Sequence, residues 1–149
     1  AVEGLIRCLP EGYNLVAKLH PLSSVDLQGE HVYTADDFST FDMLFAADYV
    51  ISDFSCVIYE AGLLDLPLFF YTFDMESYGH NRGLAIDYAA EMPGIISGDP
   101  GEIMEAIRQE KFCIEDVAKF TNRYVEETDG ATKKIAGFAL SVGRIERER

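Results

Sequence analysis

The sequence predicts an α/β fold: a Rossmann-like parallel sheet with helices on both faces and a helical C-terminus. Short apolar runs alternate along the chain with segments of helical periodicity. These runs are continuously apolar, which is typical of parallel strands that are buried on both faces. From Pro100 onward, amphipathic helical patterns follow one another.

Length and composition indicate a globular protein and exclude several other classes. The 149 residues suit one domain, and 48% hydrophobic residues argue against a disordered, collagen-like or coiled-coil chain. No run approaches the roughly 18 apolar residues of a membrane span. Three widely spaced cysteines favour a reducing, intracellular setting and form no zinc pattern. A net charge of −14 counts against nucleic acid as a partner.

The elements before residue 54 follow from short patterns. Residues 1–10 form a helical pattern that closes at Pro10 and Gly12. Residues 13–19 (YNLVAKL) and 31–34 predict the first two strands, and residues 41–47 predict a helix. Residues 49–52 (YVIS) are an apolar run that closes with Ser52 before Asp53, and they predict a third strand. Because the chain lacks an initiator methionine, we expect a fragment of a longer protein.

The second half contains the clearest patterns. Residues 54–64 predict a helix with one apolar face, formed by Phe54, Val57, Ile58, Ala61 and Leu64. Residues 67–72 (PLFFYT) predict a buried strand, and residues 73–93 predict a loop rich in glycine and tyrosine. A short strand at 94–96 precedes two or three amphipathic helices that break near Asp129-Gly130.

The distribution of charge singles out one arginine. Sixteen acidic residues and one basic residue, Arg82, lie between Leu19 and Ile107. Arg82 is either a structural ion-pair partner or the local cation for an anionic ligand, and both interpretations stay open. The basic residues from Lys111 onward alternate with acids at helical spacing, which indicates solvated helix faces.

Three groups of candidate site residues follow predicted strands, where open α/β sheets bind their ligands. His20 follows the first strand, and a structural and a functional role both stay open for it. Ser52 or Asp53 is expected to cap the helix after the third strand. The N–H groups of Ser55 and Cys56 would then point outward at the positive end of the helix dipole, which suits a phosphate.

Two further side chains complete the candidate site. Glu60 lies four residues after Cys56 on the same helix face and could accept hydrogen bonds from a ribose diol. Arg82 could hold a pyrophosphate bidentately, and Gly83 would permit close approach of the backbone. Together these groups predict a diphosphate site. No histidine has a partner at metal-ligand spacing, so we predict no metal and no cofactor.

These segments resemble the CDP-glycerol glycerophosphotransferase family, the teichoic acid polymerases and primases of Gram-positive bacteria. The matching motifs are KLHPL at residues 18–22 and the run YVISDFSCVIYEAGLLDLPLFFYTFDMESYGHNRG at residues 49–83. The Met92-Pro93-Gly94 and Asp129-Gly130 segments continue the likeness. The order of these motifs in one register is far more specific than any single one of them.

The resemblance implies a two-lobed GT-B fold. Residues 1–149 would be a single nucleotide-binding lobe, most of the C-terminal lobe, without the N-terminal acceptor lobe. His20 and Arg82 would act in catalysis. The implied contacts with CDP-glycerol are Lys18, Leu19, His20, Ser52, Asp53, Ser55, Cys56, Glu60 and Arg82. Two residues depart from the family pattern, since Cys56 replaces a serine and Glu60 stands where aspartate is common.

The implied reaction is attack by an acceptor hydroxyl on the glycerol-bearing phosphate of CDP-glycerol or a related CDP-polyol, with CMP leaving. The lipid-linked polyol-phosphate acceptor and the catalytic base would belong to the missing lobe, so we expect the fragment alone to be inactive. The full-length protein is expected in the cytoplasm, peripheral at the inner face of the membrane. An exposed sheet edge would favour a homodimer of the fragment.

Other functions stay open at this point. A GT-B lobe could use a UDP-sugar or another nucleotide-sugar donor, or could serve in binding or assembly only. A signalling receiver domain with Asp53 as phosphoacceptor would also be acidic, compact and α/β. That module needs a lysine after its last strand, and the run at 67–72 is followed by no lysine before Lys111.

Overall fold

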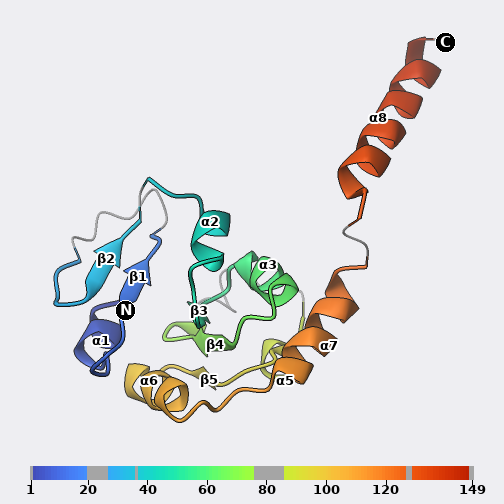
Figure 1. Ribbon diagram of the computed structural model, residues 1–149. Coiled ribbons are helices and arrows are strands. Elements are labelled where there is room, and N and C mark those ends of the chain that lie inside the picture. The colour runs from blue at the N-terminus through green and yellow to red at the C-terminus, as the bar shows by residue number, and fades with distance from the viewer. Residues whose placement is uncertain (1, 20–26, 36, 76–85, 127–128, 148–149) are drawn as a thin grey trace.

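The chain folds into short parallel strands alternating with helices (Figure 1). The computed structural model describes residues 2–19, 27–35, 37–75, 86–126 and 129–147. No helix in these ranges is long and apolar enough to cross a membrane. The elements are α1 (Val2–Arg7), β1 (Leu15–Ala17), β2 (Val32–Thr34), α2 (Thr40–Leu44), β3 (Val50–Ser52), α3 (Val57–Leu63), β4 (Leu68–Tyr71), α5 (Tyr88–Glu91), β5 (Ile96–Ser97), α6 (Pro100–Arg108), α7 (Ile114–Tyr124) and α8 (Ala131–Arg147).

All strand pairings in the described ranges are parallel, which confirms the predicted sheet type. β1 pairs with β2, and β3, β4 and β5 form a second sheet in that order. This division differs from the single sheet that we expected, because no ladder of backbone hydrogen bonds joins β1 to β3 within the described part of the chain. Side chains meet there instead, with the rings of Tyr13 and Tyr49 6.2 Å apart between centroids.

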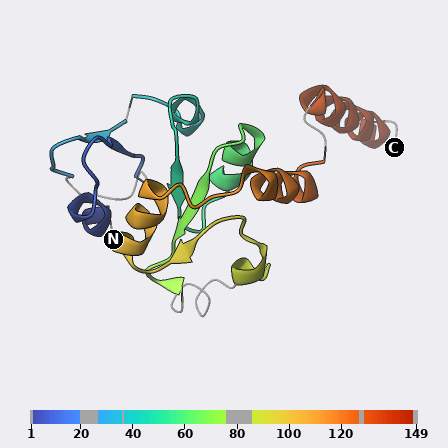
Figure 2. The ribbon, with the colours of Figure 1, turned by 60° about the horizontal axis from the view of Figure 1, so that its bottom comes forward.

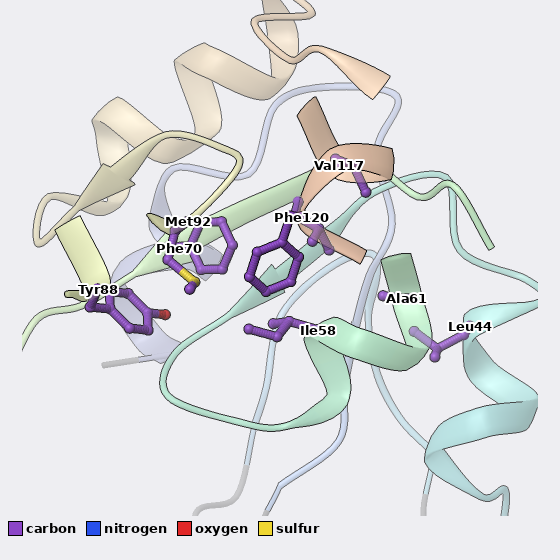
Figure 3. Close-up of a cluster of buried hydrophobic side chains, with 9 residues drawn as sticks. Leu44, Ile58, Ala61, Phe70, Tyr88, Met92, Val117 and Phe120 are labelled. Carbon is purple, nitrogen blue, oxygen red and sulfur yellow. The ribbon is translucent and has the colours of Figure 1, made fainter. Parts of the chain in front are cut away.

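β4 is the centre of the fold because its side chains serve two cores. All four of its residues are buried, and successive side chains point to opposite faces of the sheet. Phe69 and Tyr71 pack against α1 and α6. Leu68 and Phe70 pack on the other face against α3 and α7, where Figure 3 shows Phe70 beside Met92. The prediction of helices on both faces is therefore confirmed.

The packing of α3 on α7 depends on a glycine. A Cβ added at Gly62 would overlap the hydroxyl of Thr121, a buried residue of α7. That hydroxyl donates to the Val117 carbonyl at 2.9 Å and so is already committed within its own helix. The absence of a side chain at position 62 therefore allows the two helices to approach closely.

The helical C-terminus is confirmed as three helices, α6, α7 and α8. Asp99 is the N-cap of α6, and its carboxylate accepts the Gly101 N–H at 2.7 Å, with Pro100 at the first helical position. α8 projects away from the other elements (Figure 1 and Figure 2). It exposes several large apolar side chains: Ile135, Phe138, Leu140 and Val142.

Two element predictions need correction. The helix expected from residue 54 begins at Val57, three residues later. The loop expected at 73–93 contains the short helix α5, although residues 76–85 of that range lie outside the described residues. Asp87 is the N-cap of α5, and its carboxylate accepts the Ala90 N–H at 3.2 Å. A local cap thus stabilises a helix that is too short to show periodicity.

Candidate functional site

The candidate site is centred on the junction between β3 and α3, which we define as residues 52–56. β3 ends at Ser52, which is buried and paired with Phe70 of the central strand. Asp53, Ser55 and Cys56 are exposed. The sheet therefore holds the start of the junction rigidly and presents its other end to solvent at the carboxyl edge, where α/β sheets bind ligands.

The junction contains two adjacent backbone donors, the N–H groups of Ser55 and Cys56. No hydrogen bond involves the N–H of Ser55 or Cys56 within the part of the chain that the structure describes. The Ser55 hydroxyl accepts the N–H of Val57 at 3.4 Å. Because exposed N–H groups at the start of a helix attract anions, the pair can bind a phosphate group.

The expected cap of this helix was assigned to the wrong residues. Cys56 occupies the N-cap position of α3 and makes no side-chain capping bond. Neither Ser52 nor Asp53 caps the helix, because α3 starts only at Val57 and both residues lie before the turn that precedes it. The local bond to the helix start comes from Ser55 instead.

Glu60 lies where the sequence predicted it. Cys56 has helical backbone angles (φ −66°, ψ −10°), so the four-residue spacing places Cys56 and Glu60 one turn apart on the same face. Glu60 is exposed, and no hydrogen bond or ion pair engages its carboxylate among the described residues. Its carboxylate can therefore accept hydrogen bonds from a ligand that sits over the first turn of α3.

Lys18 is used by the fold itself. Its Nζ donates to the Ala35 carbonyl at 2.8 Å and to the Phe38 carbonyl at 2.7 Å. These bonds fasten the end of β1 to the turn after β2. A ligand phosphate would have to share the ammonium group with these carbonyls. The next residue, Leu19, is half-buried.

The two residues expected to act in catalysis, His20 and Arg82, lie outside the described residues, as does Gly83. Their roles stay predictions. The described ranges contain no group of three His, Cys, Asp or Glu side chains that could hold a metal ion. A receiver domain would also need an acidic pair beside its phosphoacceptor, and no such group surrounds Asp53 within those ranges.

Sequence reasoning missed one residue that contacts the junction, Tyr88. Its hydroxyl donates to the Asp53 carbonyl, and its ring packs against Phe54 with centroids 5.1 Å apart. Tyr88 lies in a stretch predicted as loop and is 35 residues from Asp53 in the chain. No local pattern signals a contact at that separation.

A groove of about 710 Å³ lies away from the junction, between α7 and the segment before β5. Most basic side chains that line this groove form ion pairs with acidic side chains beside them. Arg123 contacts Glu91 at 2.8 Å, and Lys119 contacts Asp116 at 2.7 Å. None of the junction residues 52–56 lines this groove, which adjoins the segment before β5 rather than the end of β3.

The family comparison decides how the junction is to be interpreted. The model of the CDP-Glycerol:Poly(glycerophosphate) glycerophosphotransferase family matches residues 1–137. The chain belongs to this family. The expected resemblance is therefore confirmed, and the residues at the junction belong to a glycerophosphotransferase domain.

Curated relatives of this glycerophosphotransferase domain are named for teichoic acid synthesis. The chain is 35% identical over 132 residues to the teichoic acid glycerol-phosphate primase of Bacillus subtilis (strain 168). The matched region covers 86% of this chain and 34% of the primase. It is 31% identical over 139 residues to the teichoic acid ribitol-phosphate polymerase TarL of Staphylococcus aureus. That match covers 89% of this chain and 25% of TarL. The chain thus spans about a third or less of the length of these curated relatives.

Solved structures support the same fold. A variant of the wall teichoic acid polymerase TagF matches with a TM-score of 0.73 and 22% identity, covering 99% of this chain and 38% of that chain. A TagF variant soaked with CDPG matches with a TM-score of 0.72 over 100% of this chain. The Rossmann-like fold predicted from the sequence is confirmed by these likenesses.

Proposed function

We propose that the protein containing this chain is a CDP-polyol phosphotransferase of cell-wall polymer synthesis. It transfers glycerol phosphate from CDP-glycerol to an acceptor hydroxyl and releases CMP. The observation that carries this proposal is the junction at the end of β3 in a chain of this family. There Ser55 and Cys56 are exposed, and their N–H groups have no hydrogen-bond partner among the described residues. The chain supplies the nucleotide-binding lobe of the enzyme.

The junction would bind the donor through its backbone. The N–H groups of Ser55 and Cys56 donate to an oxygen of the diphosphate, and the aligned peptides of α3 favour its negative charge. Glu60, one turn further on, accepts from the ribose hydroxyls. Because the backbone makes the phosphate contact, cysteine in place of serine at position 56 leaves that contact intact.

The transfer step needs charge stabilisation more than covalent chemistry by the protein. The acceptor oxygen forms a bond to the phosphorus that carries glycerol. The bond from that phosphorus to the bridging oxygen breaks, and the electron pair leaves on CMP. We assign stabilisation of the departing CMP to the junction, His20 and Arg82, and removal of the acceptor proton to a base elsewhere in the full-length protein.

The acceptor and the membrane are proposed to contact other parts of the protein. The chain carries a net charge of −14, which would repel both a polyanionic polymer and an anionic bilayer surface. We therefore place the lipid-linked polyol-phosphate acceptor on the remaining lobe, at the inner face of the cell membrane. In an isolated fragment, the edges of β1 and β3 that are unpaired in the described residues would favour a homodimer.

The test is a calorimetric titration of the full-length protein with CDP-glycerol, CDP-ribitol and a UDP-sugar. We expect binding of at least one CDP-polyol and no binding of the UDP-sugar. Both CDP-polyols are included because the relatives are named for glycerol phosphate and for ribitol phosphate. Preference for the UDP-sugar would overturn the proposal in favour of a nucleotide-sugar transferase.

Glu60 gives a second test of the donor site. Glu60→Ala removes the acceptor for the ribose hydroxyls, whereas Glu60→Gln keeps one amide oxygen that can accept. We expect the alanine variant to weaken CDP-glycerol binding more than the glutamine variant, by calorimetry on the full-length protein. Equal affinity of both variants and the wild type would remove Glu60 from the site.

A further inference from the structure

Tyr88 is buried in the core next to the junction, and its hydroxyl has a partner there. It is 5% exposed and lies at the start of α5, which the Asp87 cap holds in place. Its ring meets Phe70 edge-on, with centroids 5.8 Å apart and planes at 90°. Figure 3 shows the ring beside Phe70 and Met92, with the hydroxyl at the outer end of the side chain.

This one side chain holds the junction by two attachments. The hydroxyl donates to the Asp53 carbonyl, which fixes the peptide plane between Asp53 and Phe54. The ring packs on the Phe54 side chain at 5.1 Å between centroids. Because the anchored carbonyl and the anchored side chain belong to consecutive residues, φ of Phe54 is held, and ψ of Phe54 is the single-bond rotation that remains before the N–H of Ser55.

The other end of the junction is fixed by α3. The N–H of Tyr59 donates to the Cys56 carbonyl at 3.2 Å, which closes the first turn of the helix. The two N–H groups of Ser55 and Cys56 therefore lie between a helical turn and the Tyr88 attachment. Removing the hydroxyl releases the Asp53 carbonyl, whereas the sheet pairing of Ser52 and the first turn of α3 stay in place.

We propose that Tyr88 is a positioning residue for the donor phosphate. By holding the Asp53 carbonyl, its hydroxyl sets the direction in which the N–H groups of Ser55 and Cys56 point. The inference rests on the proposed function, because it assigns these N–H groups to the diphosphate. Tyr88 itself does not touch the donor in this scheme.

Loss of the hydroxyl separates positioning from folding. In Tyr88→Phe the ring and its contacts with Phe54 and Phe70 are kept, so most of the buried apolar area stays. Asp53 is exposed, so its carbonyl can turn to water and recover a hydrogen bond. The fold should therefore lose little stability, while the junction loses its preferred orientation.

The experiment compares Tyr88→Phe with Tyr124→Phe in the full-length protein. Tyr124 is a matched control because its hydroxyl also has a distant partner, Glu91, and its ring also packs on this core. Affinities for CDP-glycerol, CMP and cytidine are measured by calorimetry, with the melting temperature of each variant alongside. The three ligands share the nucleoside and differ in phosphate.

We expect Tyr88→Phe to weaken CDP-glycerol and CMP binding about three- to tenfold. This factor corresponds to the net free energy that one neutral hydrogen bond contributes. Cytidine affinity should stay unchanged, and Tyr124→Phe should alter none of the three. Equal weakening of cytidine, or wild-type affinity for CDP-glycerol, overturns the role of Tyr88. A wild-type protein that binds no cytidine nucleotide refutes the proposed function itself.

Discussion

Replacing Cys56 by proline tests whether a backbone N–H binds the donor. Cys56 has φ −66°, the value that a proline ring imposes. Its N–H has no partner among the described residues, so the fold loses no hydrogen bond there. Ser55 lies outside the helix, which suits the residue before a proline. The substitution thus removes one phosphate donor from an otherwise compatible backbone.

The expected loss follows from the type of bond. A hydrogen bond to a charged group contributes about 1.5–3 kcal/mol, which corresponds to roughly 10- to 150-fold weaker binding of CDP-glycerol. Calorimetry on the full-length protein measures it, with Cys56→Ser as a control that keeps the N–H and stays close to wild-type affinity. A folded Cys56→Pro protein with unchanged affinity would mean that the junction merely connects a strand to a helix.

Two further predictions concern packing and a thiol. Gly62→Ala should destabilise the protein by about 1–3 kcal/mol in urea unfolding, because its Cβ overlaps the Thr121 hydroxyl, whereas Gly137→Ala on exposed α8 meets no atom within 4 Å and should gain up to about 1 kcal/mol. Equal stability of the two variants would contradict this account. A hydrogen bond to Glu115 raises the pKa of the Cys113 thiol, so Glu115→Gln should lower that pKa and speed alkylation by iodoacetamide at mildly alkaline pH, measured by mass spectrometry. A slower or unchanged reaction would refute the assignment.

The sequence predicted those elements whose pattern is local. β3 and β4 were found because each is a short, continuous apolar run, the pattern of a parallel strand covered on both faces. The start of α3 was placed too early because Phe54 fits the helical stripe, although its ring packs against Tyr88 before the helix begins. α5 was missed because four residues are too few for periodicity, and its stability comes from the Asp87 cap.

The same limit applies to the candidate site. Ser55, Cys56 and Glu60 could be predicted because a strand end and helical spacing place them without knowledge of the tertiary fold. Tyr88 bonds to Asp53, and Lys18 bonds to the turn after β2. The bonded residues are 35 and 17 positions apart in the chain. Such contacts arise only when the elements pack, so no spacing in the sequence indicates them.

The order of strands in the larger sheet has a consequence for folding kinetics. β3, β4 and β5 are neighbours both in the sheet and along the chain, and each parallel pairing encloses an intervening helix or loop, as between Val50 and Leu68 or Phe70 and Ile96. Such parallel pairing is slower than the closing of a hairpin, but it needs no segment from the β1–β2 half. The half of the chain that carries the junction can therefore form one cooperative unit, to which β1 and β2 attach through side-chain packing. Mutations that weaken the β1–β2 half should then chiefly accelerate its local opening and leave the donor-binding half protected from hydrogen exchange.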